Sequence, residues 1–139
     1  MLKTDLIHPQ LLRALASAGH GATVLLADGH YPASTTLGVH ADTVNLNISP
    51  GLVDVPTVLD LLIPILPIEQ AIVMVPPPDE PEPPALADYR RRLRGVEIGT
   101  LDRWAFYDAA RSDDLALVVV TADVRKYANL LLTVGVREI

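Results

Sequence analysis

The chain has 139 residues, no cysteine and a formal net charge of −6 at neutral pH. That length predicts one domain with its own buried core, and the lack of cysteine excludes disulfides, thiol nucleophiles and thiolate metal sites. The acidic charge argues against a nucleic-acid partner, because such proteins usually carry a basic surplus. Hydrophobic residues make up 50% of the chain and aromatic residues only 4%, so a large aliphatic surface has to be buried.

The first half of the chain alternates helix and strand patterns. Apolar residues at helical spacing after Pro9 predict a helix over 9–19, and the aliphatic run TVLLA predicts a buried strand over 23–27. A polar loop over 29–41 follows. The alternating segment TVNLNI then indicates a second strand over 43–48.

The second half continues the alternation. Asp54 is placed to cap a helix over 55–65, which has Pro56 in its first turn and Pro64 at its end. The run AIVMV predicts a buried strand over 71–75. The remaining predicted elements are helices over 85–94 and 103–111 and strands over 96–101, 115–120 and 129–134.

Helices that alternate with short, continuously hydrophobic strands predict an α/β layered domain with a largely parallel sheet. The last two strands are joined only by residues 121–128. A connection that short leaves two arrangements open: the strands either pair antiparallel or lie apart in the sheet.

Prolines are concentrated in one segment. Six of the twelve prolines lie in 76–84, together with Asp79, Glu80 and Glu82. This composition is typical of an extended, polyproline-like excursion. We interpret it as a stiff acidic surface loop; the alternatives are a ligand for a proline-binding domain and a lid.

No segment has the length and apolarity of a membrane span. The longest aliphatic stretch, 58–68, contains Asp60 and two prolines, and it is shorter than the roughly 20 residues that a spanning helix needs. The first residues, MLKTD, contain no hydrophobic signal core. We therefore expect a cytoplasmic protein that does not associate with membranes.

All four histidines lie in the first forty residues. Their spacing matches no short-range zinc signature, so we predict no metal site, and a histidine is better suited here to proton transfer. His20 lies between two glycines, where it is either an accessible acid/base group or a favourable residue at a helix end.

Asp28 directly follows the predicted strand over 23–27. Ligands of open α/β sheets bind outside the carboxyl ends of the strands, where a carboxylate can accept hydrogen bonds from hydroxyl groups. A simple Asx turn is the alternative reading of the same residue. The sequence contains no GxSxG, P-loop or GxGxxG motif, so serine hydrolysis, nucleotide hydrolysis and dinucleotide binding lack support.

Three separated motifs together resemble the L-fucose mutarotase and D-ribose pyranase family. They are HPQLLRALASAGHGATVLLADGHYPA over 8–33, DRWAFYDAAR over 102–111 and RKYANLLLTVGV over 125–136. The resemblance implies a three-layer α/β/α domain over 1–139 that assembles into rings, commonly decamers. It also implies interconversion of the ring forms of a monosaccharide without a cofactor.

The resemblance also assigns roles to residues. His20 matches the family's acid/base, Asp28 binds substrate, and the Tyr-x-Asn motif falls on Tyr127 and Asn129, with Tyr127 also placed to relay a proton. Arg103 stands where fucose-type members carry Arg and ribose-type members carry His. These matches imply an L-fucose mutarotase. The alternatives are a D-ribose pyranase and a non-catalytic sugar-binding protein that assists transport.

Geometry adds an expectation about assembly. Asp28 ends the strand that His20 precedes, and eight residues of extended chain span roughly 26 Å. The two side chains should then be too far apart within one subunit to share a sugar. We therefore expect a homo-oligomer whose interfaces bury aliphatic surface and combine His20 of one copy with the remaining site residues of another.

Overall fold

The aliphatic runs of the sequence form one sheet in the computed structural model, which describes residues 1–139. Its strands lie in the order β2-β5-β1-β6-β3-β4. They are β1 (Thr23–Ala27), β2 (Asp42–Asn45), β3 (Ile68–Met74), β4 (Glu97–Leu101), β5 (Leu115–Val120) and β6 (Leu130–Val134). All six predicted strands are confirmed, although β2 ends earlier than the predicted 43–48 and β3 begins before the predicted 71–75.

The four predicted helices are confirmed as α1 (Pro9–Ser17), α2 (Val55–Leu62), α3 (Pro84–Arg92) and α4 (Arg103–Ala110). Local chemistry fixes where they begin: Asp54 accepts the backbone N–H of Thr57 at 3.0 Å, and Asp102 caps α4 in the same way. Helix α2 ends at Leu62, ahead of Pro64 and short of the predicted end at 65. None of the four helices has the length and apolarity that crossing a bilayer requires.

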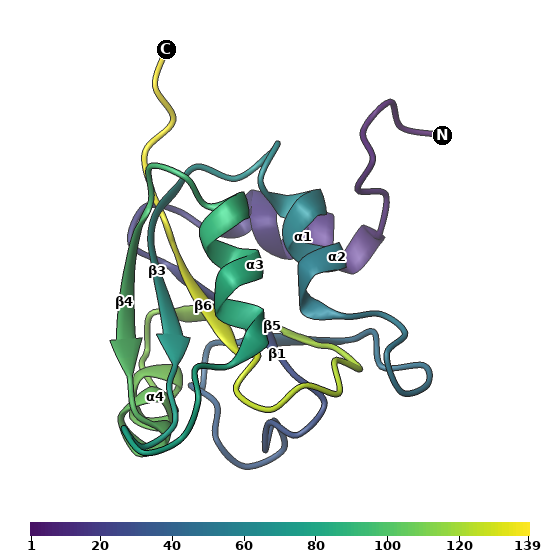
Figure 1. The fold of residues 1–139 in the computed structure, drawn as a ribbon. Helices are drawn as coiled ribbons and strands as arrows, with labels where there is room; N and C mark the ends of the chain where they lie inside the picture. The colour runs from purple at the N-terminus through teal and green to yellow at the C-terminus, as the bar shows by residue number, and fades with distance from the viewer.

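Helices cover both faces of the sheet, which confirms the three-layer α/β/α architecture. Figure 1 shows α1, α2 and α3 side by side, with α4 apart from them near the lower ends of β3 and β4. The core is divided accordingly: 24 buried residues pack on the side of α1, α2 and α3, and 10 pack on the side of α4. Residues 76–83 are largely exposed and have no regular secondary structure, in agreement with a surface loop, and Pro84 begins α3.

Strand β6 is the exception in an otherwise parallel sheet. It pairs antiparallel with both β1 and β3, so β5 and β6 lie apart, with β1 between them. Of the two arrangements that the sequence left open for the last two strands, the structure therefore has the one in which they lie apart. Since β6 runs in the opposite direction, it begins at the edge where the other strands end. The connection over 121–129 therefore stays at that carboxyl edge.

A buried ionic network fixes this connection. Asp123 is 1% exposed and accepts four bonds: three from Arg125, through Nε at 3.0 Å, Nη2 at 2.8 Å and the backbone N–H at 3.1 Å, and one from the N–H of Val55 at the start of α2 at 3.2 Å. Arg125 also reaches Asp88 of α3 at 2.7 Å. Burial raises the pKa of Asp123, but the bonds from Arg125 and Val55 outweigh burial and leave the pKa below its ordinary value.

We expect Arg125→Ala to lower the free energy of unfolding at pH 7 by about 3 kcal/mol, because it leaves the buried Asp123 carboxylate without its cation. An Asp whose folded pKa is lowered contributes stability above its ordinary pKa of 3.8, and this contribution is lost as the pH falls. The difference in free energy of unfolding between wild type and Arg125→Ala should therefore become smaller at acid pH. Urea denaturation across a pH series measures it.

The matched control is Arg111→Ala, which removes an exposed pair with Asp108 at 3.1 Å and should change stability by no more than about 0.5 kcal/mol. Equal losses for the two variants would show that the network over 121–129 does not stabilise the fold.

Candidate functional site

A cavity of about 340 Å³ opens at the carboxyl edge of the sheet. Its size lies within the range of about 300–1,000 Å³ that is typical of small-ligand sites. The lining residues are Asp28, His30, Tyr31, Met74, Arg103, Tyr107, Lys126, Tyr127 and Asn129. The structure thus brings together four of the residues predicted from the sequence: Asp28, Arg103, Tyr127 and Asn129.

Asp28 is the most constrained group of the cavity. It is 2% exposed, and its two carboxylate oxygens accept the backbone N–H of His30 at 2.9 Å and that of Ala128 at 3.1 Å. Its own N–H donates to Oδ1 of Asn129 at 2.8 Å. These bonds join the end of β1 to the start of β6. The bond to His30 is the Asx turn considered above, so Asp28 combines a turn with a place in the cavity wall.

Burial raises the pKa of Asp28, and the N–H groups of His30 and Ala128 oppose that rise. No Lys or Arg lies within ion-pair distance of this carboxylate. Each oxygen accepts one bond from the protein and keeps further acceptor capacity. Asp28 is therefore able to receive hydroxyl groups of a ligand.

Asn129 presents donors to the same space. Because its Oδ1 accepts the N–H of Asp28, the orientation of the amide is fixed and Nδ2 lies on the other side. The only protein partner of Nδ2 is the sulfur of Met74, at 3.9 Å. A thioether is a weak acceptor, so Nδ2 remains available to a ligand oxygen.

Tyr127 adopts an unusual backbone conformation, with φ of 60°. A non-glycine residue in the left-handed region persists only where its surroundings impose it. Here the following residue, Ala128, is held on both sides: its N–H donates to Asp28, and its carbonyl accepts the hydroxyl of Tyr89 from α3 at 2.5 Å. The same contacts that buried Asp28 makes therefore turn Tyr127 into the cavity wall.

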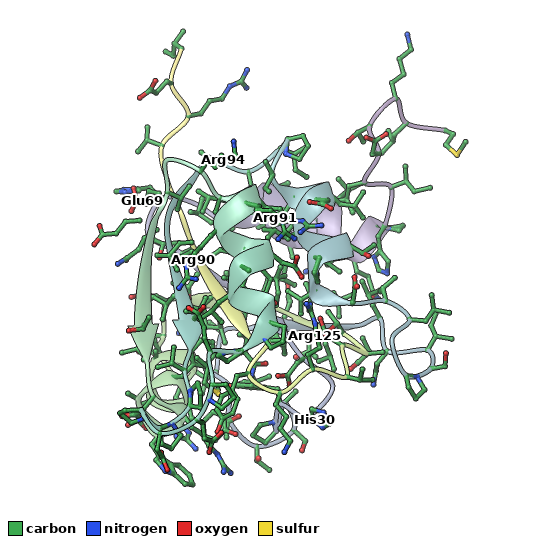
Figure 2. All side chains as sticks on the ribbon, viewed as in Figure 1. His30, Glu69, Arg90, Arg91, Arg94 and Arg125 are labelled. Atoms are coloured by element: carbon green, nitrogen blue, oxygen red, sulfur yellow. The ribbon has the colours of Figure 1, made fainter.

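His20 does not join the other predicted site residues. It precedes β1, whereas Asp28 follows β1, and its side chain is 60% exposed. Its Nε2 lies 3.1 Å from Oε2 of Glu69 in β3. In Figure 2, Glu69 lies near the upper end of the sheet and His30 near the lower end. The expected separation of His20 and Asp28 within one subunit is thus seen in the structure.

Several residues of the site were not predicted from the sequence. Glu69 is 49 positions from His20, and Met74 reaches the cavity only because β3 neighbours β6. No local sequence pattern predicts contacts between residues that are so far apart in the chain. Tyr31 and Tyr107, which pack edge to face at 5.4 Å, both fall within the family motifs, so their placement could have been predicted.

The arrangement suits a small molecule with several hydroxyl groups. Asp28 supplies acceptors, Asn129 and Arg103 supply donors, and tyrosine rings supply apolar walls. Nowhere in the structure are three or more His, Asp or Glu side chains arranged to hold a metal ion.

We expect Tyr127→Gly to be more stable than Tyr127→Ala by about 1 kcal/mol, because glycine alone adopts the left-handed backbone without a clash. The same pair of substitutions at Lys126, whose φ is not positive, should show the opposite order or no difference. Urea denaturation of the four variants measures these differences in stability. If Tyr127→Ala were at least as stable as Tyr127→Gly, the backbone at position 127 would not be strained.

The model of the RbsD / FucU transport protein family matches residues 1–137. Among solved structures, the fucose mutarotase from Streptococcus pneumoniae in complex with L-fucose is 25% identical, with a TM-score of 0.83 over 99% of this chain and 100% of that one. FucU from Bifidobacterium longum is 30% identical, with a TM-score of 0.80 over 95% and 96% of the chains.

Bacillus subtilis RbsD complexed with D-ribose has the same fold, at 21% identity and a TM-score of 0.83 over 99% of this chain and 100% of that one. The family match confirms the resemblance that the three motifs carry. Since it spans nearly the whole sequence, the chain belongs to the RbsD/FucU transport protein family.

Proposed function

We propose that the protein is a mutarotase that interconverts the α and β anomers of L-fucose, or of a closely related monosaccharide, without a cofactor. The observation that carries the proposal is the cavity, where a buried carboxylate, a carboxamide and a guanidinium face one small space in a chain of this family. The L-fucose held by the similar S. pneumoniae enzyme supports this choice of sugar.

Mutarotation needs two proton movements and one rotation. A base removes the proton of the anomeric hydroxyl while an acid protonates the ring oxygen, and the bond between C1 and the ring oxygen breaks. The open-chain aldehyde rotates about its C1–C2 bond and recloses with the opposite anomeric configuration. Groups that bind hydroxyls and move protons are sufficient for these steps.

The cavity residues divide these tasks. Asp28 accepts hydrogen bonds from sugar hydroxyls, and Asn129 and Arg103 donate to others. Tyr127 donates or relays the proton near the ring oxygen. Arg103 favours the fucose branch of the family over the ribose branch, where the resemblance implies a histidine at this position.

His20 supplies the acid/base from a second copy of the chain. Glu69 positions it: a carboxylate that accepts a hydrogen bond from Nε2–H keeps the proton of the neutral ring on Nε2 and leaves the lone pair on Nδ1. Exposed apolar side chains in loops at the carboxyl edge of the sheet support contact between copies. Ile48, Leu52 and Val124 are 79%, 51% and 57% exposed, and the N–H of Gly51 bonds the Ala122 carbonyl at 2.7 Å, which joins their two loops. A closed ring, with a decamer as the proposed size, repeats this contact at every subunit.

Exchange NMR on L-fucose tests the activity. We expect the protein to accelerate exchange between the anomers and His20→Ala to reduce that acceleration by about 10²- to 10⁴-fold, the usual worth of a general acid/base. His40→Ala, which removes another exposed histidine, is the matched control and should leave the rate unchanged.

Two other outcomes would contradict this function. Faster exchange between the pyranose and furanose forms of D-ribose, with no effect on L-fucose, would make the protein a ribose pyranase. Binding of sugars without faster exchange would make it a non-catalytic sugar-binding protein.

Subunit mixing tests the shared site. His20→Ala and Asp28→Ala chains should each be inactive alone, and after subunit exchange about one quarter of the sites combine both intact residues if copies pair at random. We expect that fraction of wild-type activity to return. Mixed oligomers that stay inactive would show that His20 and Asp28 serve the site from the same chain.

A further inference from the structure

Trp104 is a large apolar side chain that remains 67% exposed. It does not line the cavity, and its ring is not part of either hydrophobic core. Its neighbour in sequence, Arg103, does line the cavity. The indole covers the guanidinium of Arg103, and this contact accounts for its position.

Two aromatic rings bracket this guanidinium. Cζ of Arg103 lies 4.6 Å from the centroid of the Trp104 ring and 5.6 Å from that of Tyr107. The two rings are 5.9 Å apart and nearly perpendicular, at 88°. Arg103 Nε also donates to the Tyr107 hydroxyl at 3.2 Å. Cation–π attraction and one hydrogen bond thus act on the same planar group.

The bracket formed by the Trp104 and Tyr107 rings is held in place by buried packing. Tyr107 packs edge to face against Tyr31 at 5.4 Å. Tyr31 is 7% exposed, and its hydroxyl donates to the Thr36 carbonyl at 3.2 Å. Movement of the bracket would therefore disturb buried packing on the side of α4.

Arg103 depends on this bracket because nothing else holds it. It is exposed on the first turn of α4 and forms no ion pair. A free arginine samples many rotamers, and ordering it on ligand binding costs affinity. Since Nε is used by Tyr107, the donors left for a ligand are those of the two Nη atoms, which form a planar fork.

We propose that Trp104 is a positioning residue that orients Arg103, so that its two Nη groups bind two adjacent hydroxyls of the sugar ring. The proposal rests on the proposed function and deepens it, because it names a residue outside the cavity that sets sugar recognition. Trp104 acts on binding and not on proton transfer.

The kinetic test measures anomer exchange of L-fucose by the full-length protein. Trp104→Ala should raise KM about three- to tenfold and leave kcat unchanged, and Trp104→Phe should restore KM to within about twofold, since a smaller ring still attracts the cation. The effect of Trp104→Ala should shrink for two adjacent members of the series 2-deoxy-, 3-deoxy- and 4-deoxy-L-fucose, because each of them lacks one of the two hydroxyls that Arg103 binds. A fall in kcat with unchanged KM, or equal sensitivity of all three analogues, would overturn the proposal.

A spectroscopic readout is independent of activity. The Nε–H resonance of Arg103, assigned by its absence in Arg103→Lys, should show a ring-current shift that Trp104→Ala reduces and Trp104→Phe largely keeps. An unchanged resonance in Trp104→Ala would overturn the positioning role, even if the oligomer changed in size. If the wild-type protein does not accelerate exchange, the proposed function fails, while the resonance still decides the role of Trp104.

Discussion

The site depends on one buried carboxylate, that of Asp28, whose two oxygens accept backbone N–H groups from two different segments of the chain. Asp28 ends β1, accepts the N–H of Ala128 and donates its own N–H to Asn129 at the start of β6. These bonds are possible because β6 runs antiparallel between β1 and β3 and begins where they end. They bring the Tyr-x-Asn segment into the cavity, and the left-handed backbone of Tyr127 follows from them.

A second buried carboxylate at the same edge shows what Asp28 lacks. Asp123 follows β5, is paired with Arg125 and has a lowered pKa. Asp28 has no such cation, and burial raises its pKa. The ion pair of Asp123 holds the connection over 121–129 in place, whereas Asp28 keeps acceptor capacity that no charged group of the protein uses. Two similar residues thus have different roles because one is paired and the other is not.

The sequence predicted the elements well, because hydrophobic runs, capping residues and prolines are local signals. Asp54 caps the helix that it was expected to cap. The pairing of β6 with β1 was not predictable, since only distant contacts decide it. For the same reason Met74 and Glu69 were missed, whereas Asp28, Arg103, Tyr127 and Asn129 were found from the motifs and their places after strands.

The chain does not bury all of its aliphatic excess, because Ile48, Leu52 and Val124 stay exposed in loops at the carboxyl edge of the sheet. A crystal structure of the protein with L-fucose tests the central claim directly. The sugar should lie in the cavity against Asp28 and Asn129, with His20 of a second copy within hydrogen-bond distance of it. A sugar bound elsewhere, or a cavity that no neighbouring histidine approaches, would contradict this account.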